Sequence, residues 1–345
     1  MTIFTHPDYD NHEGVYIFSD PQTHMRAIIA VHNTKFGPGG GGTRFWSYEN
    51  DADALTDVLR LSRAMSYKNA MAGLPLGGGK GVILKPHEQF DRKALFESYG
   101  RAIEKVGGQY ITAEDVGVSP DDMRIIKGQT DFVAGLDEGS SASGDPSPVT
   151  ARGVFYGLQT AIKHRLNKDN FADLSVAVQG LGHVGYALCQ HLHYAGAKLI
   201  VTDINKGVLE KAKSEFDAIV VRPQDIHAQD VDVYAPCALG GAINESTIGD
   251  IKATIVGGAA NNQLKTSEMG GVLRKRGILY CPDYVINAGG IINVAAEVSG
   301  KYDPDWVEIK VSGIRDTLQL IFDRADSKQD STADVADEMA RERLA

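Results

Sequence analysis

The stretch Gly180-Leu181-Gly182-His183-Val184-Gly185 decides the fold, because it joins a predicted strand to a predicted helix. The apolar run 175–179 before it suits a buried strand. A helical pattern follows it, and a second apolar run at 198–202 ends at Asp203. This order of strand, glycine turn, helix and strand is the one that a dinucleotide-binding unit requires.

Each glycine of this stretch has a physical reason. Gly180 permits the tight turn, Gly182 lets backbone N–H groups approach a pyrophosphate, and Gly185 lets the helix pack close to the strand. Asp203 follows Gly180 by 23 residues, near the spacing at which a carboxylate binds the ribose hydroxyls of adenosine. An ordinary glycine-rich turn is the alternative, but the flanking elements and the acid favour cofactor binding.

The composition limits the class of protein. With 345 residues, 43% of them hydrophobic, the chain is long enough for two domains with sizeable cores. A net charge of −10 argues against a nucleic-acid partner. The sequence contains no run of about 18 apolar residues, the length needed to cross a membrane. The amino terminus has no signal-peptide pattern, so we expect a cytoplasmic protein without a membrane partner.

No disulfide framework and no metal site are expected. The three cysteines are odd in number and far apart in the sequence. Cys189, His191 and His193 look like a metal cluster, but residues two apart do not share a face of a helix.

The first part of the chain contains a glycine-rich segment followed by a helix that carries Lys68. An apolar strand pattern at 25–35 runs into the glycine-rich segment 37–42, whose backbone we expect to approach a ligand closely; a flexible linker is the alternative. A helix follows, with Asp51 or Asp53 as its cap. Lys68 lies on or beside the apolar face of this helix, where its amine either reaches water or serves a site.

Lys80 lies in a second glycine-rich loop, 74–81, that leads into an apolar strand at 82–84. The loop is no phosphate-binding P-loop, because its first and last residues differ from that motif and a strand follows in place of a helix. Two lysines in one partly buried site would repel each other. This repulsion lowers the pKa of at least one and leaves a base available near neutral pH.

The segment 109–117 predicts an alternating strand that carries Asp115 to its carboxyl end, before a helix capped at Ser119. Glu114 and Asp115 point to opposite faces of a strand, so at most one of them faces a given cleft. These residues alone do not choose between the two.

We expect an α/β protein of two domains with its active site in the cleft between them. The first domain, 1–135, has a mixed sheet, holds the substrate and catalytic residues and forms the oligomer; the carboxyl-terminal helix 328–345 joins it. A Gly-, Ser- and Pro-rich junction at 135–149 leads to a doubly wound Rossmann domain, 145–327. Further strands are expected at 231–235, 254–256 and 278–280, and helical patterns at 305–324 and 331–343.

Eight stretches resemble the amino acid dehydrogenases of the leucine, valine and phenylalanine branch of the Glu/Leu/Phe/Val dehydrogenase superfamily, and leucine dehydrogenases most of all. The match is specific in residues and order and covers nearly the whole chain. The stretches are Gly-Gly-Thr-Arg (41–44), Met-Ser-Tyr-Lys-Asn-Ala (65–70), Gly-Gly-Gly-Lys (77–80), Thr-Ala-Glu-Asp-Val-Gly (112–117), Pro-Ser-Pro-Val-Thr-Ala (146–151), Ala-Pro-Cys-Ala-Leu-Gly (235–240), Ala-Ala-Asn-Asn-Gln-Leu (259–264) and Pro-Asp-Tyr-Val-Ile-Asn-Ala-Gly-Gly (282–290).

The resemblance implies NAD-dependent oxidative deamination of an L-amino acid to a 2-oxo acid and ammonia, and the reverse reaction, in a homo-oligomer such as a dimer or octamer. It implies that Lys68 binds the substrate carboxylate, that Lys80 is the base that activates water, and that Asp115 exchanges protons with the amino group. The residues expected to bind substrate are Lys68, Gly40, Gly41, Met65, Ala113, Asn262, Ile291 and Val294. Those expected to bind the cofactor are Thr150, Gly180, Gly182, His183, Val184, Gly185, Asp203, Ile204, Ala238, Ala260 and Asn261.

The resemblance also bears on the substrate side chain. Glutamate enzymes of the superfamily have a lysine at the position of Gly40 and a hydroxyl at that of Val294, which bind the distal carboxylate. Neither is present here, so an apolar side chain is expected. Ala113, Ile291 and Val294 suit leucine and its relatives. Gly40 replaces a leucine that leucine dehydrogenases typically have, which enlarges the pocket and keeps phenylalanine or another aromatic substrate as an alternative.

Asp203 favours NAD, because its charge would repel the 2′-phosphate of NADP, although Lys206 lies close to it in the sequence. A non-catalytic nucleotide-binding sensor is the alternative of another class. Such a protein would be free to lose Lys68, Lys80 or Asp115, and all three are present.

Overall fold

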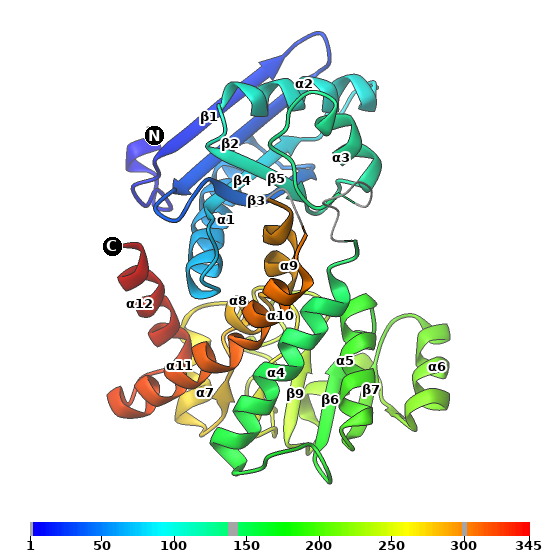
Figure 1. Ribbon diagram of the computed structural model, residues 1–345. Coiled ribbons are helices and arrows are strands. Elements are labelled where there is room, and N and C mark those ends of the chain that lie inside the picture. The colour runs from blue at the N-terminus through cyan, green and yellow to red at the C-terminus, as the bar shows by residue number, and fades with distance from the viewer. Residues whose placement is uncertain (1–2, 137–143, 299–301) are drawn as a thin grey trace. The chain divides into compact units, whose positions relative to one another are not determined.

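The computed structural model describes residues 3–136, 144–298 and 302–345, and the chain forms two compact units. Each unit combines helices with a β-sheet of its own (Figure 1). This confirms the expected two-domain α/β fold. Unit 1 is Met1–Gly144, Val294–Asp303 and Arg343–Ala345, and unit 2 is Asp145–Asn293 and Pro304–Glu342.

Unit 1 contains the mixed sheet that was expected. In its described part the strands lie in the order β1-β2-β4-β3-β5. β2 is antiparallel to β1 and β4, whereas β3 is parallel to β4 and β5. The strands are β1 (Gly14–Asp20), β2 (Met25–Asn33), β3 (Gly39–Trp46), β4 (Gly77–Leu84) and β5 (Tyr110–Glu114).

The two faces of this sheet pack against different helices (Figure 1). Ile28 and Val82 pack against α1 (Asp51–Met71). Ile29 and Ile83, their neighbours in β2 and β4, pack against α2 (Arg92–Lys105) and α3 (Pro120–Lys127). Because side chains alternate along a strand, Lys80 lies on the same face as Val82, toward α1.

The glycine-rich segment 37–42 enters a strand, β3, which the sequence did not predict. A Cβ at Gly41 would lie 2.0 Å from the carbonyl oxygen of Gly79 in β4, so a side chain there would separate the two backbones. These glycines therefore serve the close approach of neighbouring strands. β4 already begins at Gly77, so Lys80 lies within a strand and not in the loop that was expected.

The start of α1 also differs from the prediction. The side chain of Asn50 accepts a hydrogen bond of 3.0 Å from the backbone N–H of Asp53, so Asn50 is the cap. Asp51 and Asp53, the expected caps, lie in the first turn, where negative charge is favourable near the helix N-terminus.

Unit 2 has the parallel sheet of a doubly wound fold. β6 and β7 begin and end at the predicted residues. The described strands lie in the order β8-β7-β6-β9-β10-β11, all parallel, which is the 3-2-1-4-5-6 order of a Rossmann domain. They are β6 (Ser175–Gln179), β7 (Lys198–Thr202), β8 (Ile219–Val220), β9 (Val233–Pro236), β10 (Ile255–Val256) and β11 (Leu279–Tyr280).

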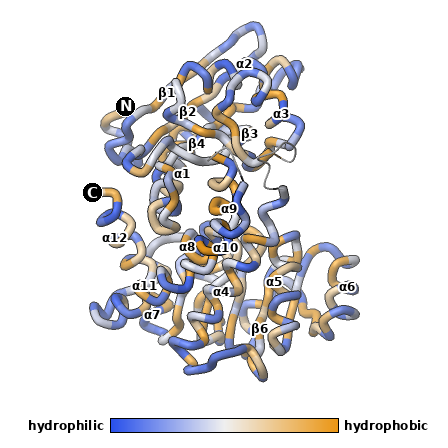
Figure 2. Tube along the Cα trace, in the orientation of Figure 1, coloured by the Kyte–Doolittle hydropathy of each residue, from blue (hydrophilic) through white to orange (hydrophobic). Residues whose placement is uncertain are grey.

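The helices that follow along the chain are α4 (Ser147–Leu166), α5 (His183–Tyr194), α6 (Lys206–Phe216), α7 (Glu268–Lys275), α8 (Asp283–Ile286), α9 (Gly289–Val298), α10 (Pro304–Ser312), α11 (Ile314–Lys328) and α12 (Thr332–Leu344). α9 is apolar along most of its length (Figure 2), and the division between the units falls within it. The helical pattern expected at 305–324 is two helices, α10 and α11, with Gly313 between them.

The carboxyl-terminal helix is grouped differently from the expected domain boundaries, which placed 328–345 with the first domain. Most of α12 belongs to unit 2, where the Thr332 hydroxyl donates to the carbonyl oxygen of Tyr280 at 2.6 Å. Its last residues belong to unit 1, where Arg343 donates to the carbonyl oxygens of Ala70 and Met71 at the end of α1. Residues 137–143 of the expected junction lie outside the described residues.

Among the described residues, no helix is both long and apolar enough to span a bilayer. Because each unit is described by itself, the cleft expected between the two domains stays a prediction.

Candidate active site

Lys80 and Asp115 form an ion pair at the centre of unit 1. The Nζ atom of Lys80 lies 2.6 Å from Oδ2 of Asp115, which directly follows β5. The lysine is only 6% exposed, whereas the preceding Glu114 is exposed to solvent. The structure therefore pairs the lysine with Asp115, a choice that the strand pattern alone had left open.

Burial and neighbouring charges shift both groups of this pair. Burial lowers the pKa of Lys80, and the carboxylate of Asp115 opposes this shift without cancelling it. For Asp115, burial favours a higher pKa, but the ion pair with Lys80 and the charge of Arg44 outweigh it and lower the pKa. The site therefore holds an ionised carboxylate beside a lysine that releases its proton more readily than usual.

A buried network of hydroxyl groups fixes the strands beneath this pair, and sequence reasoning missed it. The Thr43 hydroxyl lies 2.7 Å from that of Tyr99 and 2.6 Å from that of Thr112. The Tyr110 hydroxyl donates to the carbonyl oxygen of Gly41 at 2.8 Å. Thr43 and Thr112 lie within quoted motifs, but those motifs do not show the contact between them, because the four side chains lie on β3, β5 and α2 and meet only in the folded sheet.

Lys68 lies in the last turn of α1, next to a residue that fixes the helix to the sheet. The buried Asn69 amide donates to the carbonyl oxygen of Gly77 at 2.6 Å and, more weakly, to that of Gly40 at 3.4 Å. A Cβ at Gly41 would also lie 3.0 Å from Cγ of Met65. Met65 and Gly41 are therefore neighbours, and Asn69 places α1 against the glycine strands.

Ala113 and Val294, both predicted to bind the substrate side chain, both lie close to Gly135. A Cβ built at Gly135 would lie 3.7 Å from Cβ of Ala113 and 3.9 Å from Cγ2 of Val294. The buried carboxylate of Glu297 accepts hydrogen bonds from the backbone N–H groups of Gly135, at 2.6 Å, and Leu136, at 3.3 Å. Glu297 thus holds this apolar wall in place, a role that the sequence did not reveal.

The space beside Gly40 is already filled. A Cβ at this position would lie 3.0 Å from Cδ1 of Leu76, whose side chain is buried. The larger pocket expected from glycine in place of leucine is therefore offset by Leu76.

In unit 2, a cavity of about 510 Å³ adjoins the glycine turn. Residues of the turn, of α5 and of the segment after β7 line it. They are Asp145, Leu181, Gly182, His183, Tyr186, Ala187, Gln190, Asp203, Asn205, Val208 and Lys211. Nδ1 of the exposed His183 lies 3.7 Å from Oδ2 of Asp145. The cavity thus contains Gly182, His183 and Asp203 of the predicted cofactor site.

The glycines of the turn meet the requirements inferred for them. Gly180 has a φ of +96°, and a Cβ there would lie 2.8 Å from Cβ of Ala238. A Cβ at Gly185 would lie 2.0 Å from the carbonyl oxygen of Gly180. No described atom lies within 4 Å of the Cβ position of Gly182, so the surface that would face a pyrophosphate is open. Val184 lies beside Gly185 in the first turn of α5.

Asp203 lines this cavity, and two exposed apolar side chains, Ile204 and Leu239, follow β7 and β9. The carboxylate of Asp203 accepts hydrogen bonds from the backbone N–H groups of Leu181, at 2.6 Å, and Asn205, at 2.7 Å, so it holds the glycine turn in addition to the expected ribose contact. Ile204 is 95% exposed and Leu239 is 86% exposed. Ligands of such sheets bind at the carboxyl ends of the strands, where both side chains lie, and an apolar cofactor ring would cover them. Leu239 was missed, although it follows the predicted Ala238.

The other predicted residues of unit 2 lie on loops and helix ends. Thr150 lies in the first turn of α4, and its hydroxyl donates to the carbonyl oxygen of Pro146 at 3.0 Å. The buried amide of Asn287 donates to Oδ1 of Asn261 at 2.8 Å and so fixes the loop that carries Ala260 and Asn262. Ile291 lies in α9, half-buried.

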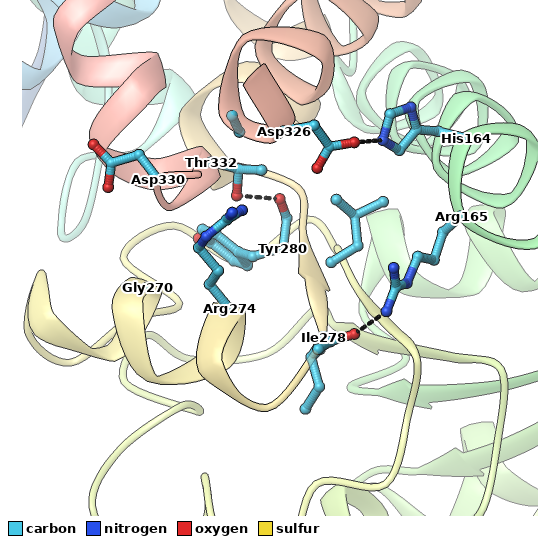
Figure 3. Close-up of a pocket in the computed structure, with 12 residues that line it drawn as sticks. His164, Arg165, Gly270, Arg274, Ile278, Tyr280, Asp326, Asp330 and Thr332 are labelled. Carbon is cyan, nitrogen blue, oxygen red and sulfur yellow. Dashed lines mark hydrogen bonds and ion pairs between the residues drawn. The ribbon is translucent and has the colours of Figure 1, made fainter. Parts of the chain in front are cut away.

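A second cavity in unit 2, of about 190 Å³, contains none of the predicted residues (Figure 3). Most of its polar groups hold elements together. Arg165 donates to the carbonyl oxygen of Gly277 at 2.6 Å, and Nε2 of His164 lies 3.1 Å from Oδ2 of Asp326. In the described part of the chain no group of three or more His, Cys, Asp or Glu side chains could hold a metal.

The parallel sheet with its glycine turn, together with the buried lysine and aspartate, defines a dinucleotide-dependent oxidoreductase with acid–base groups. Residues 12–132 match the family model of the Glu/Leu/Phe/Val dehydrogenase dimerisation domain, and residues 143–219 and 203–325 match that of Glutamate/Leucine/Phenylalanine/Valine dehydrogenase. The chain therefore belongs to the Glu/Leu/Phe/Val dehydrogenase family and is an amino acid dehydrogenase, an oxidoreductase that acts on CH–NH₂ groups with NAD or NADP.

Individual relatives agree with this assignment. The chain is 46% identical over 344 residues to the leucine dehydrogenase of Bacillus subtilis (strain 168), and 47% identical over 344 residues to that of Geobacillus stearothermophilus; each comparison covers 100% of this chain and 94% of the relative. The crystal structure of L-tryptophan dehydrogenase from Nostoc punctiforme is similar with a TM-score of 0.87 and 43% identity, over 97% of this chain and 96% of that chain.

Proposed function

We propose that this amino acid dehydrogenase catalyses the reversible, NAD-dependent oxidative deamination of leucine and other branched-chain L-amino acids to the 2-oxo acid and ammonia. The observation that carries the proposal is the buried pair of Lys80 and Asp115, whose atoms lie 2.6 Å apart. A lysine with a lowered pKa is suited to base catalysis, because it is deprotonated in a larger fraction of molecules near neutral pH. This pair also argues against a non-catalytic sensor.

In this proposal three side chains of unit 1 bind the substrate and transfer protons. The ammonium group of Lys68 binds the substrate carboxylate. Asp115 accepts a proton from the substrate ammonium group, and loss of the hydride from the α-carbon then leaves an iminium. Lys80 takes a proton from the water molecule that attacks the iminium carbon. The C–N bond of this adduct breaks as Asp115 returns its proton to the leaving nitrogen, which releases ammonia and the 2-oxo acid. The dinucleotide, when bound, accepts the hydride from the α-carbon.

The apolar wall around Gly135 supports a branched aliphatic substrate. Ala113 and Val294 present methyl groups and no charge, so a distal carboxylate would be buried without a partner there. Leu76 occupies the space beside Gly40, which favours leucine over a larger aromatic side chain. Dehydrogenation of phenylalanine or another aromatic amino acid is the second candidate, which the similarity to an L-tryptophan dehydrogenase supports.

The charge of Asp203 supports NAD over NADP. Its carboxylate lines the same cavity as Gly182, and a 2′-phosphate beside it would be repelled. The exposed Ile204 and Leu239 and the open surface at Gly182 fit a dinucleotide. Comparing kcat/KM for the two cofactors tests this choice, and a preference for NADP would contradict it.

We also propose that the chain forms a homo-oligomer, a dimer or an octamer. The family model that matches residues 12–132 is described as a dimerisation domain, and Ile17 in the edge strand β1 is 73% exposed. Light scattering on the purified protein measures the assembly, and a monomer would contradict the proposal. The cytoplasmic location expected from the sequence stays a prediction.

A substrate panel tests the proposed reaction. Purified protein is mixed with NAD and single L-amino acids, and the absorbance of the reduced cofactor is followed. We expect the highest kcat/KM with leucine, lower values with valine and phenylalanine, and no turnover with glutamate. Turnover with glutamate alone, or with no amino acid, would overturn the proposal, and a preference for phenylalanine or tryptophan would favour the second candidate.

A further inference from the structure

We propose that Arg44 is a positioning residue of the active site, which holds the Asp115 carboxylate together with Lys80 and keeps a permanent positive charge beside the base. The inference rests on the proposed function, because it assigns Lys80 and Asp115 their roles in catalysis. Arg44 is not among the residues to which the family resemblance assigns a role.

One carboxylate oxygen of Asp115 is shared between two cations. Oδ2 lies 2.6 Å from Nζ of Lys80 and 3.4 Å from Nε of Arg44. Both contacts are ion pairs without hydrogen-bond geometry, so Arg44, the more distant of the two cations, acts on the carboxylate mainly through its charge. When Lys80 gives up its proton, Arg44 is therefore the cation that still stabilises ionised Asp115.

A second carboxylate fixes the guanidinium group from the other side. Nη1 of Arg44 lies 2.8 Å from Oδ2 of Asp57 on α1, and the Tyr48 hydroxyl donates to the same oxygen at 2.6 Å. The side chain of Arg44 is 24% exposed, and those of Asp57 and Asp115 are 26% and 23% exposed. Unlike a surface ion pair, this set is shielded from solvent and connects β3, α1 and the segment after β5.

The charges around Lys80 act in opposite directions. Burial is the main cause of its lowered pKa; Asp115 and Asp57 raise the pKa, and Arg44 lowers it. Lys68, on the same helix as Asp57, is the other cation of the predicted site. Burial has the largest effect on the pKa of Asp115 and raises it. Lys80 lowers this pKa more strongly than Arg44 does, and Arg44 lowers it further. Arg44 thus favours the ionisation states that catalysis requires, a neutral amine and a charged carboxylate.

Opposite substitutions test this role through the pH profile of kcat/KM for L-leucine. The rate of oxidative deamination should rise with pH as Lys80 loses its proton. In Arg44→Gln the pKa of Lys80 rises, so this acidic limb should move to higher pH by about 1 unit. In Asp57→Asn a charge that raises the pKa of Lys80 is lost, so the limb should move to lower pH. The double variant, which changes no net charge, should return toward the wild-type profile.

Two further variants separate charge from structure. Arg44→Lys keeps the positive charge, so its limb should stay near that of the wild type even if kcat falls. Arg101→Gln removes an arginine of α2 whose Nη2 lies 3.8 Å from Oδ2 of Asp20, outside the site, and should leave the profile unchanged. Unfolding midpoints of all variants show whether each is folded; if Arg44→Gln is not, Asp57→Asn still tests the direction of the shift.

The outcomes distinguish this inference from the proposed function. Limbs that stay in place, or that move in the same direction in Arg44→Gln and Asp57→Asn, would overturn the role of Arg44 while wild-type turnover of leucine stands. Absence of turnover in the wild type would instead overturn the proposed function.

Discussion

Replacing Lys80 by methionine should abolish catalysis without preventing cofactor binding. The substitution removes the amine that lies 2.6 Å from Asp115 and keeps a side chain of similar length in a position that is only 6% exposed. A general base contributes a factor of about 10² to 10⁴, so kcat/KM for L-leucine should fall by at least about 10², a loss of about 3 kcal/mol or more in transition-state stabilisation.

The cost in stability should be smaller than for most broken buried ion pairs. Removing one partner of such a pair costs about 3–5 kcal/mol when the other charge is left alone. In Lys80→Met, Asp115 still has Nε of Arg44 at 3.4 Å, so we expect a loss below about 3 kcal/mol in the free energy of unfolding. Urea unfolding measures this difference.

The assay follows reduced cofactor with L-leucine, and a fluorescence titration measures the dissociation constant of NAD. Lys93→Met is the matched control, because this lysine of α2 is 73% exposed and should tolerate the change with full activity. Turnover of Lys80→Met within a factor of about 3 of the wild type would refute the assignment of the base.

Three further predictions concern other parts of the chain. In Gly185→Ala a Cβ would lie 2.0 Å from the carbonyl oxygen of Gly180, so the glycine turn must shift. The affinity for NAD, measured by fluorescence titration, should fall about tenfold or more. An unchanged affinity would argue against the glycine turn as the NAD-binding site. The pKa of His12 is lowered from 6.5 to about 4, mainly by burial, so the unfolded state binds more protons than the folded state between these pH values. Up to about 3 kcal/mol of the free energy of unfolding should therefore be lost as the pH falls from 6.5 to about 4. In urea unfolding His12→Gln should show a shallower pH dependence of stability than the wild type, and an equal dependence would exclude His12 as its source. Glu297→Ala removes the acceptor of two backbone N–H groups near Ala113, which should lower the free energy of unfolding by about 1–3 kcal/mol. It should also raise KM for leucine several-fold more than it lowers kcat. An unchanged KM in steady-state kinetics would contradict the role of Glu297.

The sequence predicted the elements whose signals are local. β6, the glycine turn and β7 lie at the predicted residues, because strand burial, positive φ and close packing each demand particular residue types at adjacent positions. The Rossmann class of unit 2 followed from the same signals, and the structure supplies its strand order.

The glycine strand β3 could not be predicted from local preference. Glycine is rare in strands, and the reason for it here is the carbonyl oxygen of Gly79, 2.0 Å from the Cβ position of Gly41. That neighbour is nearly 40 residues away in the sequence, and only the folded sheet brings the two together. The same holds for α12, whose grouping depends on contacts such as that of Thr332 with Tyr280.

For the candidate site, the sequence identified the reacting groups better than their supports. Lys80 and Asp115 lie in recognisable motifs and meet at 2.6 Å. Arg44 and Asn69 lie in such motifs too, but their supporting contacts, like those of Glu297, are with residues on other elements, so the sequence does not show what they hold. The roles of all these residues in binding and catalysis stay predictions until variants are measured.

The most direct test of the central claim follows the hydrogen on the α-carbon of the substrate. Wild-type protein is incubated with NAD and L-leucine that carries deuterium at the α-carbon, and the reduced cofactor is analysed by mass spectrometry. If the chain transfers a hydride from the amino acid to the dinucleotide, the reduced cofactor carries the deuterium and 2-oxo acid and ammonia form in equal amounts. Reduced cofactor without deuterium, or no reduction at all, would contradict the account.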